Sequence, residues 1–155
     1  SGEIVLDQAD LSKSSVEATV QAGSIWTDNE RRDGHLKSED FFAAEKFPTA
    51  TFKSTKITPN GKTKFKMTGD LTIRGVTKQV TFDGELLGVG AVGVGGQSWG
   101  TRAGFTASTV LNRKDYGINW NKALDQGGFV LSDDVKVSIN IEAVKQKPAA
   151  AAAAK

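Results

Sequence analysis

The sequence predicts an all-β protein, a meandering antiparallel sheet that closes into a barrel. Two long segments, residues 63–73 and 76–87, alternate apolar and polar side chains on either side of Gly75. Strand side chains point to opposite faces at period two, so each segment has one apolar face and one solvated face. Six or seven such segments occur, mostly at hairpin spacing, with one helical excursion around residues 28–46. Closure of the sheet would remove exposed strand edges.

Composition narrows the class of protein. The 155 residues suit one domain, residues 1–146, followed by a low-complexity Pro/Ala tail at 147–155. The 20 basic and 18 acidic residues are spread along the chain with a net charge of +2, so binding to nucleic acid or an anionic membrane is not indicated. Cysteine is absent, which excludes disulfides and thiolate-bound metals. No apolar run reaches membrane-spanning length.

The first elements are short. Residues 4–6 end one strand, and residues 16–20 alternate as a second. Thr27 or Asp28 can then cap a short polar helix, since Thr and Asp are favoured N-cap residues.

A further helical turn holds Phe41 and Phe42 and ends before Pro48, because the residue preceding a proline disfavours the helical conformation. Residues 49–57 read as a strand centred on a phenylalanine, and Pro-Asn-Gly at 59–61 predicts a hairpin turn into the long pair.

The second half continues the meander. Residues 88–96 contain five glycines and predict a loop, whereas residues 99–111 form another strand. Asp-Tyr-Gly at 115–117 predicts a turn, and the alternating residues 135–141 form the last strand.

No motif in the sequence indicates catalysis. Residues 88–93 match Gly-x-Gly-x-x-Gly, but the dinucleotide fingerprint needs a helix next, and a strand follows here. His35 is the only histidine and lies on a polar segment, which favours a solvated or hydrogen-bonding role. The scattered aspartates favour surface and turn positions. We therefore expect a protein that is not an enzyme, with no catalytic residue, no metal and no cofactor.

The interior of the barrel is the informative feature. Large aromatic side chains lie on the inward faces together with the small residues Gly69, Gly84, Ala103 and Ala107. An eight-stranded barrel is about the size at which side chains either fill the interior or leave space for one small ligand. The residues alone leave these two alternatives open.

Several blocks resemble the YceI-like family. The most specific is residues 68–78, Thr-Gly-Asp-Leu-Thr-Ile-Arg-Gly-Val-Thr-Lys, followed by Val-Thr-Phe at 80–82. Further blocks match in order along residues 2–146. They are residues 10–18, 27–42, 46–55, 99–105 and 111–120 and the final strand.

This resemblance implies a lipocalin-like fold, an extended eight-stranded antiparallel barrel. It also implies a long polyisoprenoid chain, such as an isoprenoid quinone or its precursor, as the ligand of the interior. The function would be carriage, storage or sensing of that lipid. Many members are exported, so we expect a periplasmic or secreted protein, although no signal peptide is present in this chain and a cytoplasmic location is left open. Several members are dimers, so a homodimer is a further expectation.

The chain departs from the family in one respect. Members usually carry a further hairpin before the block equivalent to residues 1–6. Without that hairpin we expect an open seam with two unpaired strand edges.

The predicted ligand-binding residues are inward aromatic and aliphatic side chains, with two polar residues near the mouth for a head group. They are Phe41, Phe42, Phe52, Phe65, Met67, Leu71, Ile73, Phe82, Leu86, Phe105, Leu111 and Trp120, with Arg102 and Asn112 as the polar pair. Two alternatives stay open: a packed barrel that serves as an interaction module, and a binder of fatty-acid-like amphiphiles.

Overall fold

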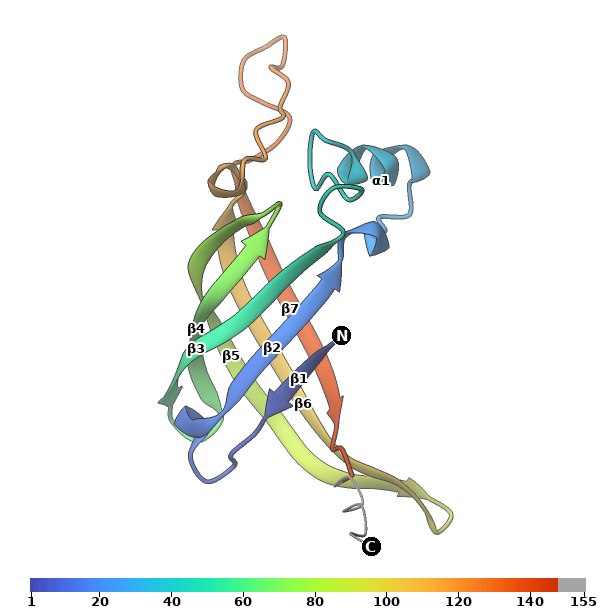
Figure 1. Ribbon diagram of the computed structural model, residues 1–155, viewed down its shortest axis with the longest axis vertical. Helices are drawn as coiled ribbons and strands as arrows, with labels where there is room; N and C mark the ends of the chain where they lie inside the picture. The colour runs from blue at the N-terminus through green and yellow to red at the C-terminus, as the bar shows by residue number, and fades with distance from the viewer. Residues whose placement is uncertain (148–155) are drawn as a thin grey trace, which may run out of the picture.

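The structure, a computed structural model, describes residues 1–147 and confirms an all-β fold (Figure 1). One sheet contains seven strands in the order β1-β2-β3-β4-β5-β6-β7, each antiparallel to the next. The strands are β1 Gly2–Val5, β2 Ser15–Gln21, β3 Thr49–Asn60, β4 Lys64–Ile73, β5 Val76–Val94, β6 Gln97–Asn112 and β7 Asp134–Val144. The helices are α1 Glu30–Lys37 and the short 3₁₀ turns η1 Leu11–Lys13, η2 Ala22–Ser24 and η3 Arg113–Tyr116.

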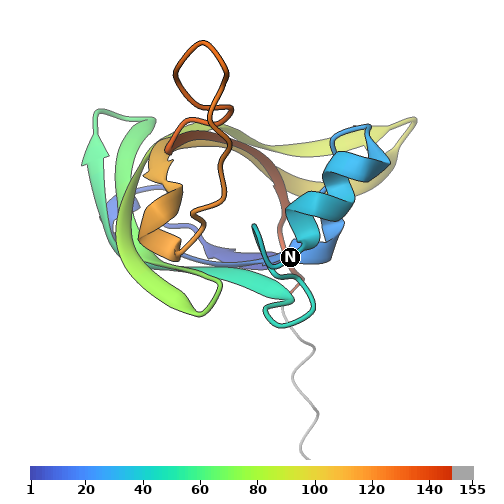
Figure 2. The ribbon, with the colours of Figure 1, turned by 90° about the horizontal axis from the view of Figure 1, so that it is seen from above.

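The sheet curls into a barrel shape but does not close (Figure 2). Among residues 1–147 no ladder joins β1 to β7, and the sheet has seven strands rather than eight. Closure, expected from the strand pattern, is therefore wrong, whereas the open seam with two unpaired edges that was also expected is confirmed. The seam exposes side chains that a closed barrel would bury. Val135 and Ile141 lie at inward positions of β7, yet both are exposed.

The β4–β5 hairpin forms as the alternating pattern predicted. Ile73 pairs with Val76, so the turn consists of Arg74 and Gly75 alone. Both turn residues have positive φ, 51° and 73°. Two-residue turns of this kind match the right-handed twist of the strands they connect.

The predicted loop at residues 88–96 is wrong, because β5 continues through most of it. Gly93 pairs with Ser98 and Val94 with Gln97, which leaves only Gly95 and Gly96 in the turn. The backbone ladder with β6 supplies hydrogen bonds irrespective of side chains, so a glycine-rich segment can extend a strand when a partner lies beside it.

The region before β4 also differs in detail. Asn29, not Thr27 or Asp28, is the N-cap of α1, and its side chain accepts a hydrogen bond from the Arg32 amide at 2.9 Å. Asp28 has φ of 60°, whereas an N-cap residue adopts an extended conformation. Residues 38–47 form successive turns after α1, and β3 extends three residues further than predicted, so the next turn is 61–63.

The apolar core lies inside the barrel. Its buried members are Phe52, Ile57, Met67 and Phe82. Phe82 pairs with Met67 across the β4–β5 ladder, and its ring meets that of Phe52 edge to face at a centroid distance of 5.3 Å. This cluster holds β3, β4 and β5 together and supports the wall of the pocket described below.

Two segments, residues 28–47 and 113–133, lie around one end of the barrel and are here called the cap (Figure 2). His35 contacts Phe41 and Trp120 edge-on, with ring centroids 5.0 Å and 4.7 Å apart. Arg74 donates hydrogen bonds to the carbonyls of Phe41 and Gly117, so the β4–β5 turn connects both halves of the cap.

Candidate functional site

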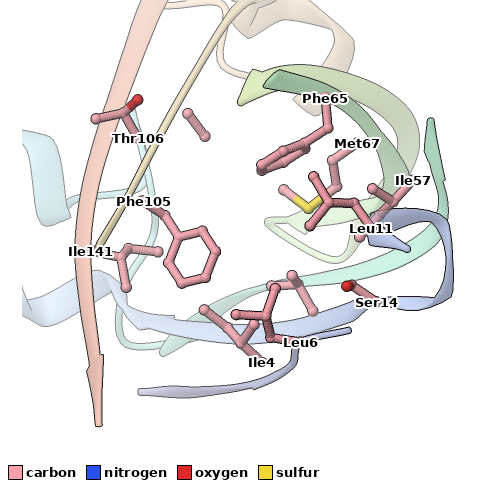
Figure 3. A pocket seen from close by; sticks show the side chains of 12 residues that line it. Ile4, Leu6, Leu11, Ser14, Ile57, Phe65, Met67, Phe105, Thr106 and Ile141 are labelled. Atoms are coloured by element: carbon pink, nitrogen blue, oxygen red, sulfur yellow. The ribbon is translucent and has the colours of Figure 1, made fainter. Parts of the chain in front are cut away.

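An apolar pocket lies inside the barrel, toward the end opposite the cap (Figure 3). The pocket is partly open, and its cavity volume is about 50 Å³. None of its lining residues is ionisable. They are Ile4, Leu6, Leu11, Ser14, Val16, Ile57, Phe65, Met67, Phe105, Thr106, Ala107 and Ile141.

The pocket is built from both sides of the seam. Ile4 of β1 and Ile141 of β7 line it from the two unpaired edges, and Phe105 of β6 lies near both (Figure 3). Leu11 reaches it from η1, where the Asp10 side chain accepts a hydrogen bond from the Ser12 amide and caps the turn. The open seam therefore runs beside the pocket.

Two glycines of the wall receive aromatic rings. A Cβ on Gly84 would lie 2.5 Å from Cζ of Phe65, and a Cβ on Gly69 would lie 2.5 Å from Cζ of Phe52. Both distances are below any van der Waals contact, so each ring occupies the space above its glycine. At Gly69 and Gly84 the small residue therefore allows an aromatic ring to lie against the wall.

The structure brings only part of the predicted ligand-binding set to the pocket. Phe65, Met67 and Phe105 line it. Phe52 and Phe82 belong to the core cluster, against which Leu71 packs. Phe41 and Trp120 lie together in the cap at the other end. The remaining apolar members are half-buried and do not line the pocket: Phe42, Ile73, Leu86 and Leu111.

The predicted polar pair does not form a single site. Asn112 ends β6 and Arg102 lies ten residues before it on the same strand, a separation of roughly 33 Å. Arg102 forms an ion pair with Glu142, and the Asn112 side chain accepts a hydrogen bond from the Lys114 amide at the start of η3. One head group therefore cannot contact both residues.

Sequence reasoning missed Leu11, because it lies in the connector at residues 7–14, which reads as turn-rich, and Leu6, which ends the short first strand. Ile57 was missed because a bulge between Ser54 and Lys56 changes which residues of β3 point inward. Leu11 is the only large apolar residue of its connector, which was the available signal.

The cap is organised by one buried cation. Arg113 is buried and donates hydrogen bonds to the carbonyls of Ser132, Ile118 and Trp120 and to the Asp133 carboxylate at 3.2 Å. Burying a guanidinium is unfavourable unless its donors are satisfied, and this arrangement satisfies them. These hydrogen bonds hold the loop between η3 and β7 against the Arg113 side chain.

Titratable groups of the cap serve structure rather than chemistry. His35 Nε2 lies 2.8 Å from the Asp40 carboxylate, which agrees with the expected hydrogen-bonding role. The Thr27 hydroxyl donates to Asp33 and holds the pKa of that carboxyl below its usual value. Burial raises the pKa of Tyr116, whose hydroxyl finds no partner within residues 1–147.

Two further properties concern residues 1–147, the part of the chain that the structure describes. No group of three or more His, Cys, Asp or Glu side chains there could hold a metal ion. No helix there has both the length and the apolar character needed to cross a membrane.

Comparison with known proteins gives a consistent result. The model of the YceI-like domain matches residues 1–143. The UPF0312 protein SA2479 of Staphylococcus aureus is 41% identical over 136 residues, which cover 88% of this chain and 75% of that protein. The UPF0312 protein PputW619_0484 of Pseudomonas putida is 37% identical over 146 residues, covering 94% and 70% respectively.

Solved structures agree with the fold. The crystal structure of the Campylobacter jejuni YceI protein superimposes with a TM-score of 0.76 at 33% identity, covering 95% of this chain and 81% of that one. Burkholderia cenocepacia BcnA superimposes with a TM-score of 0.73 at 24% identity, covering 93% and 83%, and supports the fold alone. The family match across nearly the whole chain, together with these identities, shows that this protein belongs to the YceI-like family.

Proposed function

We propose that this protein binds a long-chain polyisoprenoid lipid, such as an isoprenoid quinone or its precursor, in the interior of the barrel. The observation that carries the proposal is a pocket with no ionisable lining residue inside a YceI-like barrel. Such a surface offers no charged partner and no ionisable side chain for acid–base catalysis. It is suited to an apolar chain, which family resemblance also indicates.

The driving force would be burial of the chain. Each methylene removed from water contributes about 0.8 kcal/mol. Ordering a flexible chain and restricting its translation cost several kcal/mol in return. Affinity would therefore depend on chain length, and shortening the lipid should weaken binding more than changing its head group.

The pocket must enlarge to accept such a chain. Its volume of about 50 Å³ is well below the roughly 150 Å³ of a cavity that holds benzene. Met67 has three rotatable side-chain bonds, and such residues adapt readily to irregular space. The open seam beside Ile4 and Ile141 gives the wall freedom to move outward.

The same small volume favours a second candidate function. In this alternative the core is packed, nothing binds inside, and the barrel serves as an interaction module. The two candidates differ in one measurable property: whether an apolar chain displaces the side chains that now fill the interior.

The proposal is tested by titrating delipidated protein with an isoprenoid quinone and, separately, with a fatty acid. Phe105→Arg should abolish quinone binding, because it places an unpaired charge in the apolar pocket. Val110→Arg is the matched control: it lies on the same strand, and its side chain is 57% exposed. The control should bind as the parent protein does.

The outcomes separate the candidates. Saturable quinone binding that Phe105→Arg removes and Val110→Arg preserves supports the proposal. Binding of the fatty acid in preference to the quinone would mean that the ligand is a fatty-acid-like amphiphile and not a polyisoprenoid. Absence of binding to either lipid, in a protein that unfolds cooperatively, would favour the packed module.

A further inference from the structure

The β5–β6 hairpin projects beyond the rest of the sheet as a two-stranded arm, residues 87–101 (Figure 1). The ladder between β4 and β5 ends at the pair Lys64 and Glu85. The ladder between β6 and β7 ends at Arg102 and Val144. Past these points one further backbone hydrogen bond reaches the arm, from the Lys145 amide to the Thr101 carbonyl. Beyond it, both outer edges of the arm lack a neighbouring strand in the described structure.

The arm is uncharged and apolar in a chain of which 25% is charged. No ionisable residue occurs between Glu85 and Arg102. The exposed apolar side chains there are Leu87, Val89, Val92, Val94 and Trp99. An isolated two-stranded ribbon is at best marginally stable in water, and an exposed apolar patch marks an interaction surface.

The arm lies at the pocket end of the barrel, away from the cap (Figure 1). Leu86, just before the arm, pairs with Phe105, which lines the pocket. Strand β6 therefore carries one side of the arm and, a few residues further on, the pocket-lining residues Phe105 and Ala107. An occupant that is itself apolar and extended would contact both.

The chemistry of the arm fits a lipid surface better than a protein strand. Its ladder is interrupted by register shifts near Gly88 and Gly93, which disfavour a long continuous pairing with another chain. Trp99 is 53% exposed, and tryptophan is enriched at membrane–water interfaces. The unpaired backbone groups of both edges need water or head groups, which excludes burial in the hydrocarbon core.

We propose that the arm docks this protein onto the surface of a lipid bilayer, with its apolar side chains in the interfacial layer and the pocket end of the barrel facing the membrane. The interaction is apolar rather than electrostatic, because the arm carries no charge. It does not require a bound ligand, so it stands separately from the proposed function.

Co-sedimentation with vesicles tests this inference. Purified full-length protein is mixed with vesicles of phosphatidylcholine alone and with vesicles of phosphatidylcholine and phosphatidylglycerol. We expect binding to both, with little dependence on salt. Val94→Glu and Trp99→Glu should each weaken binding by roughly tenfold or more, because a charge in the interfacial layer is unfavourable.

Trp26→Glu is the matched control. Trp26 is 76% exposed beside the cap, at the opposite end of the barrel. This variant should bind vesicles as the parent does, and thermal unfolding should show that all three variants fold. Equal binding by Val94→Glu and Trp26→Glu, or no binding of the parent to either vesicle, would overturn the inference.

Two other results are also decisive. Binding only to the anionic vesicles, and its loss in salt, would assign the interaction to charges elsewhere and reject the arm. The parent protein could instead be a dimer that does not bind vesicles and that Val94→Glu converts to a monomer. That result would show that a second copy of this chain occupies the arm. Quinone binding by the arm variants is measured in parallel, so failure of docking and failure of the proposed function are distinguished.

Discussion

At the scale of residues, the packing of the barrel interior depends on aromatic rings that lie against glycines. Phe65 lies directly across the ladder from Gly84, and its ring fills the space that any side chain at that position would need. The alternating pattern identified Phe65, Met67 and Phe105 as inward residues, but it could not show this seating. The orientation of each ring depends on its neighbours on the adjacent strand. Those neighbours are determined by the strand register, which the sequence alone does not show.

Gly84→Ala should therefore destabilise the fold. The new methyl group would force the Phe65 ring into the interior, and overpacking of this kind costs about 1–3 kcal/mol. Gly90→Ala, on the same strand with nothing within 4 Å of its Cβ position, should change stability by less than about 0.5 kcal/mol. Urea unfolding measures both; equal stabilities of the two variants would show that the ring moves without cost.

Asp33 gives a prediction for pH dependence. Its lowered pKa means that the ionised carboxylate stabilises the fold above the ordinary aspartate pKa of about 3.9, and that this contribution is lost as pH falls through the lowered value. Thr27→Val removes the main cause, so the pKa should rise. The variant should be less stable than the parent at pH 7, with the difference vanishing in acid.

Thr27→Ser retains a hydroxyl and serves as the control. Carboxyl-carbon NMR titration of Asp33 reports the pKa in each protein. An unchanged Asp33 pKa in Thr27→Val would refute the assigned cause.

At the scale of elements, the cap segment 113–133 is held by Arg113 rather than by regular structure. Sequence reasoning found a turn at 115–117 but gave Arg113 no role, because nothing in its local pattern marks an arginine as buried. Its partners include carbonyls up to nineteen residues away. Strands were predicted more reliably, because the alternation of apolar and polar residues is a local pattern. The glycine-rich end of β5 was predicted as a loop because its own residues show no alternation. It forms a strand through its pairing with β6.

Arg113→Ala should lower stability by about 3 kcal/mol or more, since it leaves several carbonyls of the cap without donors. Lys114→Ala is the control, because Lys114 pairs with the same Asp133 carboxylate from an exposed position at 2.9 Å. That pair is worth less than about 1 kcal/mol. Hydrogen exchange in residues 118–133 should accelerate only in Arg113→Ala. Similar behaviour of the two variants would mean that the cap does not depend on this buried cation.

At the scale of the whole molecule, the seven strands form a wall whose seam adjoins an apolar pocket. The sequence predicted the meander, because each strand carries its own alternation. It predicted closure from the general tendency of sheets to remove their edges, and the ladders of residues 1–147 do not meet that expectation. The open seam was predicted instead by comparing the order of the sequence blocks with the family pattern, because strand alternation alone does not show whether two edges pair.

The central claim is that the barrel interior holds a long apolar lipid. Native mass spectrometry of the protein purified from bacteria, followed by solvent extraction and lipid identification, tests it most directly. We expect a bound species with the mass of a prenyl lipid, absent from Phe105→Arg and present in Val110→Arg. A parent protein that carries no lipid and has the mass of the bare chain, both before and after incubation with an isoprenoid quinone, would contradict it.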